Sequence, residues 1–127
     1  MLKRQPFAAA ALDLFVLVEA GELTGLLCAT TLTTLHYIVA KGGNTKLAVQ
    51  SIQNLLQLFE IAPANRPVLE AAVILPFSDF EDAVLYEAGR HSNVNGIVTR
   101  DPADFKQPQI AVYSPNELIA ILRTQKE

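Results

Sequence analysis

Short apolar runs alternate along this chain with longer segments of helical periodicity, and this alternation limits its fold more than any other feature. The runs are too short for helices and predict buried strands. Strands separated by helices of ten or more residues pair in parallel through right-handed crossovers. The sequence therefore predicts an α/β fold, a three-layer α/β/α sandwich around a parallel sheet. The expected strands are residues 23–29, 59–62, 97–99 and 110–113.

Residue types that begin helices precede most of the helical segments. Thr30 and Thr31 offer hydroxyls for one N-terminus, and Asn44 and Asn65 offer amide oxygens for two others. Two further segments open on a capping box, a serine followed three residues later by a glutamate, each side chain bonding the backbone amide of the other. These boxes begin at residues 78 and 114. The predicted helices are residues 6–20, 30–41, 44–58, 65–75 and 79–92, and a last one from residue 115.

The composition predicts one domain over residues 1–127. Half of the residues are apolar (50%) and 18% are charged, enough for a core without disulfides or a structural metal. Cys28 stands in an apolar run, where a lone thiol packs as a small hydrophobe, and this favours a reducing compartment. No apolar stretch approaches the roughly 20 residues of a membrane span. We expect a cytoplasmic protein that does not bind membranes.

The charge pattern points to a local site. The net charge of -3 gives no overall field to attract nucleic acid. The acids are unevenly spread, with none between Glu22 and Glu60 and six of the thirteen within residues 79–104. Any chemistry on RNA or DNA must therefore come from a local site, and this acidic stretch is the first indication of where it lies.

Four of these acids are expected to approach one another. Ligands of a parallel sheet bind beyond the carboxyl ends of its strands, and Asp101 and Asp104 follow the strand at residues 97–99. Asp79 and Asp82 stand three apart and share a helix face. Carboxylates are the ligands that Mg²⁺ and Mn²⁺ prefer, and such ions support phosphodiester hydrolysis. RNA hydrolysis is the reaction that this pattern favours.

Each of these residues also has a structural interpretation. Asp79 fits a helix cap, and Asp104 fits a turn acceptor. The candidate substrate contacts beside the acids are Arg90, Thr99, Arg100 and Lys106, although scattered surface cations are common. The chain has neither a nucleophile elbow nor a glycine-rich phosphate loop.

Several segments together resemble the PIN domain family, over nearly the whole chain. The resemblance implies a metal-dependent ribonuclease, in many bacterial members the dimeric toxin of a toxin-antitoxin pair, with Mg²⁺ or Mn²⁺ held by three or four acids. It implies that Asp82 is the helix ligand, Asp101 the ligand after the strand and Asp104 an auxiliary ligand, and these three are the candidate catalytic residues. The matching segments are residues 23–25, 31–37, 79–86, 97–105 and 112–115.

Two departures from the family pattern bear on activity. The family's first strand, which ends in an essential Asp, has no counterpart, so we expect a PIN domain truncated at its N-terminus. The helix where many members carry a Glu offers only residues such as Thr33 and His36. The resemblance then implies at most one weakly bound ion and impaired RNA hydrolysis. The alternative is a non-catalytic α/β module that binds a protein partner, such as an antitoxin, or RNA.

The absent strand has a structural consequence, because the family places it in the middle of the sheet. Buried amides and carbonyls without partners cost roughly 1 to 3 kcal/mol each. We therefore expect its two neighbours either to close up into a four-stranded sheet or to recruit a strand from another subunit. The second outcome, together with exposed apolar surface, predicts a homodimer.

Overall fold

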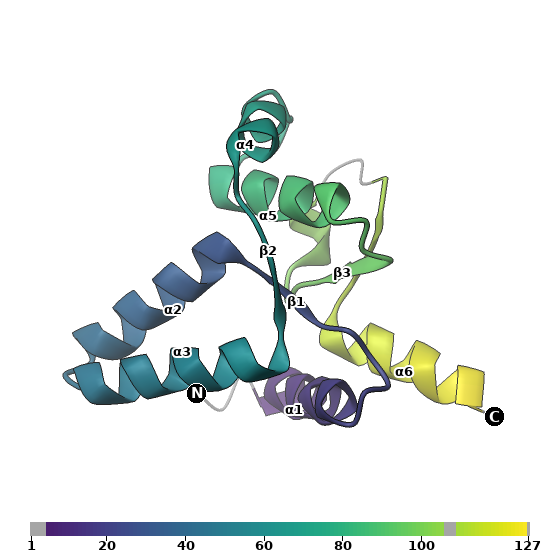
Figure 1. The fold of residues 1–127 in the computed structure, drawn as a ribbon. Helices are drawn as coiled ribbons and strands as arrows, with labels where there is room; N and C mark the ends of the chain where they lie inside the picture. Colours follow the sequence, from purple (N-terminus) through teal and green to yellow (C-terminus); the bar gives the residue numbers. More distant parts are fainter. Residues whose placement is uncertain (1–4, 106–108, 127) are drawn as a thin grey trace.

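The computed structural model describes residues 5–105 and 109–126. Helices and strands alternate in the predicted order, and the predicted α/β class with parallel strands is confirmed (Figure 1). The elements in chain order are α1 (Gln5–Glu19), β1 (Leu26–Cys28), α2 (Ala29–Lys41), α3 (Thr45–Leu58), β2 (Glu60–Ala62), α4 (Arg66–Val73), α5 (Phe80–His91), β3 (Gly96–Val98), the 3₁₀ turn η2 (Pro102–Asp104), β4 (Ala111–Tyr113) and α6 (Pro115–Lys126).

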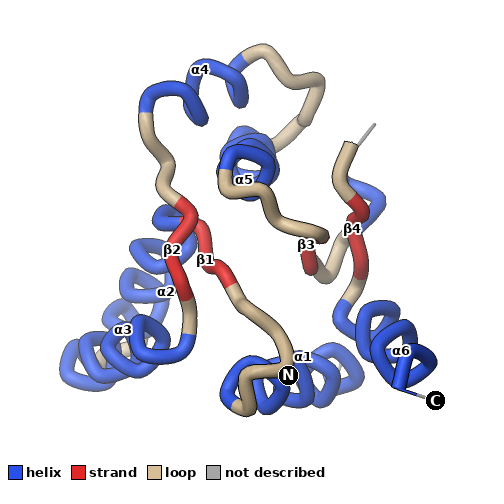
Figure 2. Tube along the Cα trace, turned by 45° about the vertical axis from the view of Figure 1, so that its right-hand side comes forward, coloured by secondary structure: helices blue, strands red, loops and turns tan. Residues whose placement is uncertain are grey.

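The strands form two separate pairs. β1 pairs in parallel with β2, and β3 pairs in parallel with β4, while no ladder joins β1 to β3 within the described residues. The expected closure into one four-stranded sheet is therefore wrong for this structure. β1 and β3 are the inner strands of the arrangement, and each uses only one of its two edges (Figure 2).

Helices cover the strands from two sides, as the sandwich prediction requires. Figure 2 shows α4 and α5 above the strands, and α1 and α6 below them. α5 contacts β1, β2 and β3, so it connects the two strand pairs, and α1 packs against α6. The pair formed by α2 and α3 projects from one side of the molecule (Figure 1).

The buried residues fall into three clusters, whereas a domain of this size usually has one continuous core. One cluster lies between β1, β2, α4 and α5, with Val68 and Ala88 fully buried. A second gathers around Ile97 of β3, and a third, around Leu14, joins α1 to α6. The accessible surface is 8623 Å², where a compact monomer of 13.8 kDa exposes about 6,600 Å². Leu75, Phe77 and Leu85 pack against both the first and the second cluster, so partly buried side chains join these two.

Several of the predicted helix caps are confirmed. Asn44 accepts a hydrogen bond from the amide of Leu47 at 2.9 Å, and Asn65 accepts one from the amide of Val68 at 3.3 Å. The capping box at the start of α6 is complete. The amide of Glu117 donates to Ser114 Oγ at 3.1 Å, and the amide of Ser114 donates to Glu117 Oε1 at 2.7 Å.

Two predicted helix starts are wrong. The capping box at Ser78 does not form, because Asp79 is the N-cap of α5 and its Oδ1 accepts from the amide of Glu81 at 2.9 Å. Thr30 and Thr31 do not begin α2, since β1 runs directly into this helix with Cys28 at the cap position. Thr30 instead places its Oγ1 3.2 Å from the buried Cys28 Sγ. The prediction of a packed thiol is confirmed.

No helix in residues 5–105 and 109–126 is both long and apolar enough to cross a membrane.

Candidate functional site

Asp82 lies in the first turn of α5 and is the least exposed of the predicted ligands. α5 positions it because the buried face of this helix, including Ala83 and Val84, packs against β1 and β2. The Asp82 side chain is half-buried, while those of Asp101 and Asp104 are exposed. None of these carboxylates takes part in a cap or a salt bridge within the described part of the chain.

A short loop after β3 carries Asp101 and Asp104. The amide of Asp101 donates to Thr99 Oγ1 at 3.3 Å, and the amide of Asp104 donates to the carbonyl oxygen of Asp101 at 3.0 Å. Asp101 is the N-cap of η2, but its side chain makes no capping bond. The backbone thus fixes the loop, and its carboxylates remain available to solvent and ions.

Neighbouring acids act electrostatically on Asp82. The pKa of Asp82 is raised above its ordinary value of 3.8, first by burial and then by the negative charges of Asp79, Asp104, Glu81 and Asp101. That Asp79, Asp82, Asp101 and Asp104 form one site stays a prediction. A cation or a proton at Asp82 relieves this repulsion.

The same residues do not assemble a complete metal centre. Among the described residues, no three His, Cys, Asp or Glu side chains gather in a group that can hold a metal ion. Mg²⁺ can bind through one or two carboxylates while keeping most of its waters, but two-metal hydrolysis requires a larger set of ligands. The residues present therefore do not fit the full metal site of a hydrolase.

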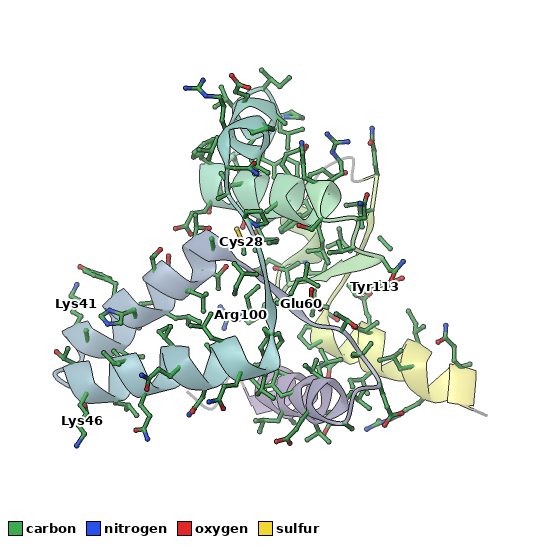
Figure 3. The ribbon with its side chains drawn as sticks, in the orientation of Figure 1. Cys28, Lys41, Lys46, Glu60, Arg100 and Tyr113 are labelled. Carbon is green, nitrogen blue, oxygen red and sulfur yellow. The ribbon has the colours of Figure 1, made fainter. Side chains whose placement is uncertain are left out.

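The other predicted site residues lie in different surroundings. The Thr99 amide donates to the Tyr113 carbonyl at 2.9 Å, and its hydroxyl holds the loop at Asp101, so its observed role is structural. Arg100 is exposed, and Lys106 lies outside the described residues. Asp79 caps α5, in agreement with its structural interpretation. Figure 3 shows that Lys41 and Lys46 lie at the outer end of the α2 and α3 pair, away from α5.

A second polar group lies further along α5. Its Arg90 is a predicted phosphate contact, but the sequence did not predict its buried partner Glu87. Glu87 is 2% exposed and its Oε1 accepts from Arg90 Nε at 2.9 Å, with His91 Nδ1 at 3.5 Å. It borders a surface hollow of about 330 Å³ that none of the predicted ligands lines. A glutamate three residues before an arginine is common on exposed helix faces, so spacing gave no signal of burial.

The comparisons with known proteins agree with the fold. Residues 1–103 match the PIN domain family, so the chain belongs to this family, which is of the nuclease type. The comparisons with curated proteins and with solved structures give no match. Divalent metals are generally used by PIN domains.

Proposed function

We propose that this chain is a PIN-domain protein of ribonuclease lineage in which metal-dependent hydrolysis of RNA is impaired. The observation that carries the proposal is the incomplete acidic site. The negative charges of Asp101 and Asp104 help to raise the pKa of Asp82. Within the described residues, however, no three side chains form a group that can hold a metal ion. Asp82, Asp101 and Asp104 are the residues that would hold Mg²⁺ or Mn²⁺, and the ion would activate water for attack on a phosphodiester.

The separated strand pairs give a physical reason for the impairment. Asp101 and Asp104 follow β3, and Asp82 begins the helix that spans both pairs. In a continuous sheet, the neighbouring strand ends would meet at one edge and contribute further ligands there. Here the edge beside β3 belongs to no ladder in residues 5–105 and 109–126. Within the described residues, the β1 and β2 pair therefore adds no strand end to a ladder beside the loop that carries Asp101 and Asp104.

The alternative is a non-catalytic module that binds a protein partner, such as an antitoxin, or RNA. Exposed apolar side chains at the end of α4 favour a protein partner, since Val73 is 67% exposed and Ile74, which follows the helix, is 83% exposed. We propose the same surface as the interface of a homodimer, and we propose that the protein is cytoplasmic. Size-exclusion chromatography with light scattering tests the dimer, and Ile74→Asp should convert it to a monomer.

Cleavage of a single-stranded RNA by the folded protein tests the proposal. Four samples are compared: the chain with Mn²⁺, the chain with a chelator, Asp101→Asn with Mn²⁺, and Asp13→Asn with Mn²⁺ as the matched control. Asp13 is an exposed carboxylate on α1, paired with Arg123 at 3.5 Å.

We expect equal and background rates in all four samples. Cleavage that needs Mn²⁺, disappears in Asp101→Asn and persists in Asp13→Asn would show that the remaining acids suffice for catalysis. That result would overturn the proposal. Fluorescence anisotropy with the same RNA then separates an RNA-binding module from one that binds protein.

A further inference from the structure

The surface hollow of about 330 Å³ lies between the loop after α4 and the second half of α5. Much of its wall is apolar, with Leu75 and Phe77 from the loop and the ring of Tyr86 from α5. Two charged side chains, Glu87 and Arg90, complete the wall on the side of α5. A hollow of this size with apolar walls and a few polar groups is the usual form of a small-molecule site.

The aromatic side chains of the hollow are held in place by their neighbours. The ring of Phe77 lies 5.5 Å from that of Phe105 and 5.6 Å from that of Tyr86, measured between ring centroids. Tyr86 is 3% exposed, and its hydroxyl oxygen accepts a hydrogen bond from the amide of Gln109 at 2.6 Å. Phe77 is only half-buried, so its ring offers an ordered aromatic surface to a ligand.

Glu87 turns one carboxylate oxygen into this hollow. Arg90 Nε donates to Oε1 at 2.9 Å, and His91 Nδ1 lies 3.5 Å from the same oxygen, whereas Oε2 has no hydrogen-bond partner among the described residues. In this part of the chain, every side-chain oxygen that is shut off from solvent has a partner, so Oε2 keeps some accessible surface. Because Glu87 is 2% exposed and lines the hollow, that surface opens into it.

Arg90 places hydrogen-bond donors beside this oxygen. Its Nε is bonded to Glu87, but its two terminal nitrogens have no partner within residues 5–105 and 109–126. The pair therefore presents one free acceptor next to free donors, at the wall of an apolar hollow. A carboxylate oxygen that is almost fully buried is costly unless a donor reaches it, and here a donor can reach it only through the hollow.

These groups define the ligand that fits. It is flat, it stacks on an aromatic ring, and it carries a donor beside an acceptor along one edge. Adenine presents its N6 amino donor next to a ring-nitrogen acceptor, whereas guanine presents two acceptors, N7 and O6, on the corresponding edge. The opposite edge of guanine carries two neighbouring donors, which require both carboxylate oxygens, and Glu87 Oε1 is already bonded.

We propose that this hollow binds an adenine base, whose N6 amino group donates to Glu87 Oε2 and whose neighbouring ring nitrogen accepts from a terminal nitrogen of Arg90. The base stacks on Phe77, as bases do on aromatic side chains. It belongs to a free nucleoside or nucleotide or to single-stranded RNA, and the recognition is the same in each. The proposal does not rest on RNA hydrolysis, since none of the predicted metal ligands lines the hollow.

Adenosine titrated into the ¹⁵N-labelled full chain tests the site. We expect the amide resonances of Phe77 and Gln109, which line the hollow, to shift. That of Ala48 should not, because α3 lies away from α4 and α5 (Figure 1). The binding efficiency per atom of drug-sized ligands gives a Kd on the order of 0.1 mM. Purine riboside, which lacks only the amino group, and guanosine should each bind about tenfold more weakly.

Glu87→Gln should exchange the preferred base. The carboxamide oxygen has to face Arg90 Nε, which leaves an NH₂ group in the place of Oε2. Two donors then face the ligand, and they match the two acceptors of guanine. We expect this variant to bind guanosine about tenfold more tightly than adenosine. Glu70→Gln is the matched control and should keep the preference for adenosine, since Glu70 is exposed, pairs with Arg66 and is not among the described residues that line the hollow.

Two further ligands distinguish the sources of the base. A single-stranded oligoadenylate that binds at least about tenfold more tightly than adenosine, with an affinity that falls as salt is added, assigns the site to RNA. AMP that binds as tightly as the oligoadenylate assigns the site to a free nucleotide.

Three results would overturn the proposal: no shift of Phe77 and Gln109 at millimolar adenosine, equal binding of adenosine and purine riboside, or an unchanged preference in folded Glu87→Gln. The comparison of nucleosides uses the unchanged protein, so it decides the matter even where the variant fails to fold. RNA cleavage enters none of these readouts, so a failure of this site is distinct from a failure of the proposed function.

Discussion

The Glu87 carboxylate is the most buried charge among the described residues. The free energy of unfolding of the protein therefore depends on its ion pair with Arg90. Glu87 is 2% exposed, while the Arg90 side chain is 44% exposed and bonds it at 2.9 Å. Arg90→Ala leaves this buried carboxylate with His91 alone. We expect a loss of about 1 to 3 kcal/mol in the free energy of unfolding, measured by urea denaturation.

The matched control is Arg66→Ala. Arg66 pairs with Glu70 at 3.4 Å, but both side chains are exposed, at 84% and 67%. Exposed pairs contribute little, so this change should stay within about 0.5 kcal/mol of the wild type. Equal effects of the two substitutions would contradict the structural role given to Glu87.

The ionised side chain of Asp82 should lower the free energy of unfolding at neutral pH. Its pKa is raised above 3.8 by burial and by neighbouring acids. The folded chain therefore binds the proton of the Asp82 carboxyl group more tightly than the unfolded chain does. The free energy of unfolding therefore falls as the pH rises through the window above 3.8, and the penalty is absent below it.

Asp82→Asn removes the ionisable carboxyl group, and with it the loss of stability at neutral pH. Because the side chain is only partly buried, solvent screening limits the gain at pH 7 to about 1 kcal/mol. Thermal unfolding between pH 3 and 8 checks this, with Asp13→Asn as the control for charge. A variant less stable than the wild type at pH 7 would be inconsistent with repulsion at Asp82.

At the scale of elements, two similar capping motifs behave differently. Ser114 forms both bonds of its capping box, whereas Ser78 leaves the cap of α5 to Asp79. Ser114→Ala should therefore cost about 1 kcal/mol, while Ser78→Ala should change little. Chemical denaturation of the two variants side by side measures the difference. A larger loss from Ser78→Ala would refute the observed cap.

These serines also show what the sequence can and cannot specify. Periodicity placed all of the helices and strands to within a few residues, because apolar spacing reflects which face is buried. The choice between adjacent capping residues such as Ser78 and Asp79 depends on how the preceding loop enters the helix. The strand-end rule predicted the acidic group around Asp82, but the separation of its carboxylates depends on the loop after β3.

At the scale of the whole molecule, the separated strand pairs were the least predictable feature. Apolar runs indicate strands, but they do not show whether two strands will close across a gap. Closure here would require moving β1 and β3 relative to α5, which packs against both. Close packing against one helix opposes such a shift.

Hydrogen exchange should reveal the separation directly. The Thr99 amide is bonded to Tyr113, whereas the Val98 amide faces away from the ladder. We expect Val98 to exchange at least about tenfold faster than Thr99. Similar protection of the two amides would indicate that β3 pairs on both edges in the isolated chain.

The central claim is that the acids around Asp82 form an incomplete metal site, and Mn²⁺ binding followed by electron paramagnetic resonance tests it most directly. We predict one site weaker than about 0.1 mM, abolished by Asp101→Asn and unaffected by Asp13→Asn. Stoichiometric binding at micromolar Mn²⁺, or binding of two ions, would contradict this account of the site and of its impaired chemistry.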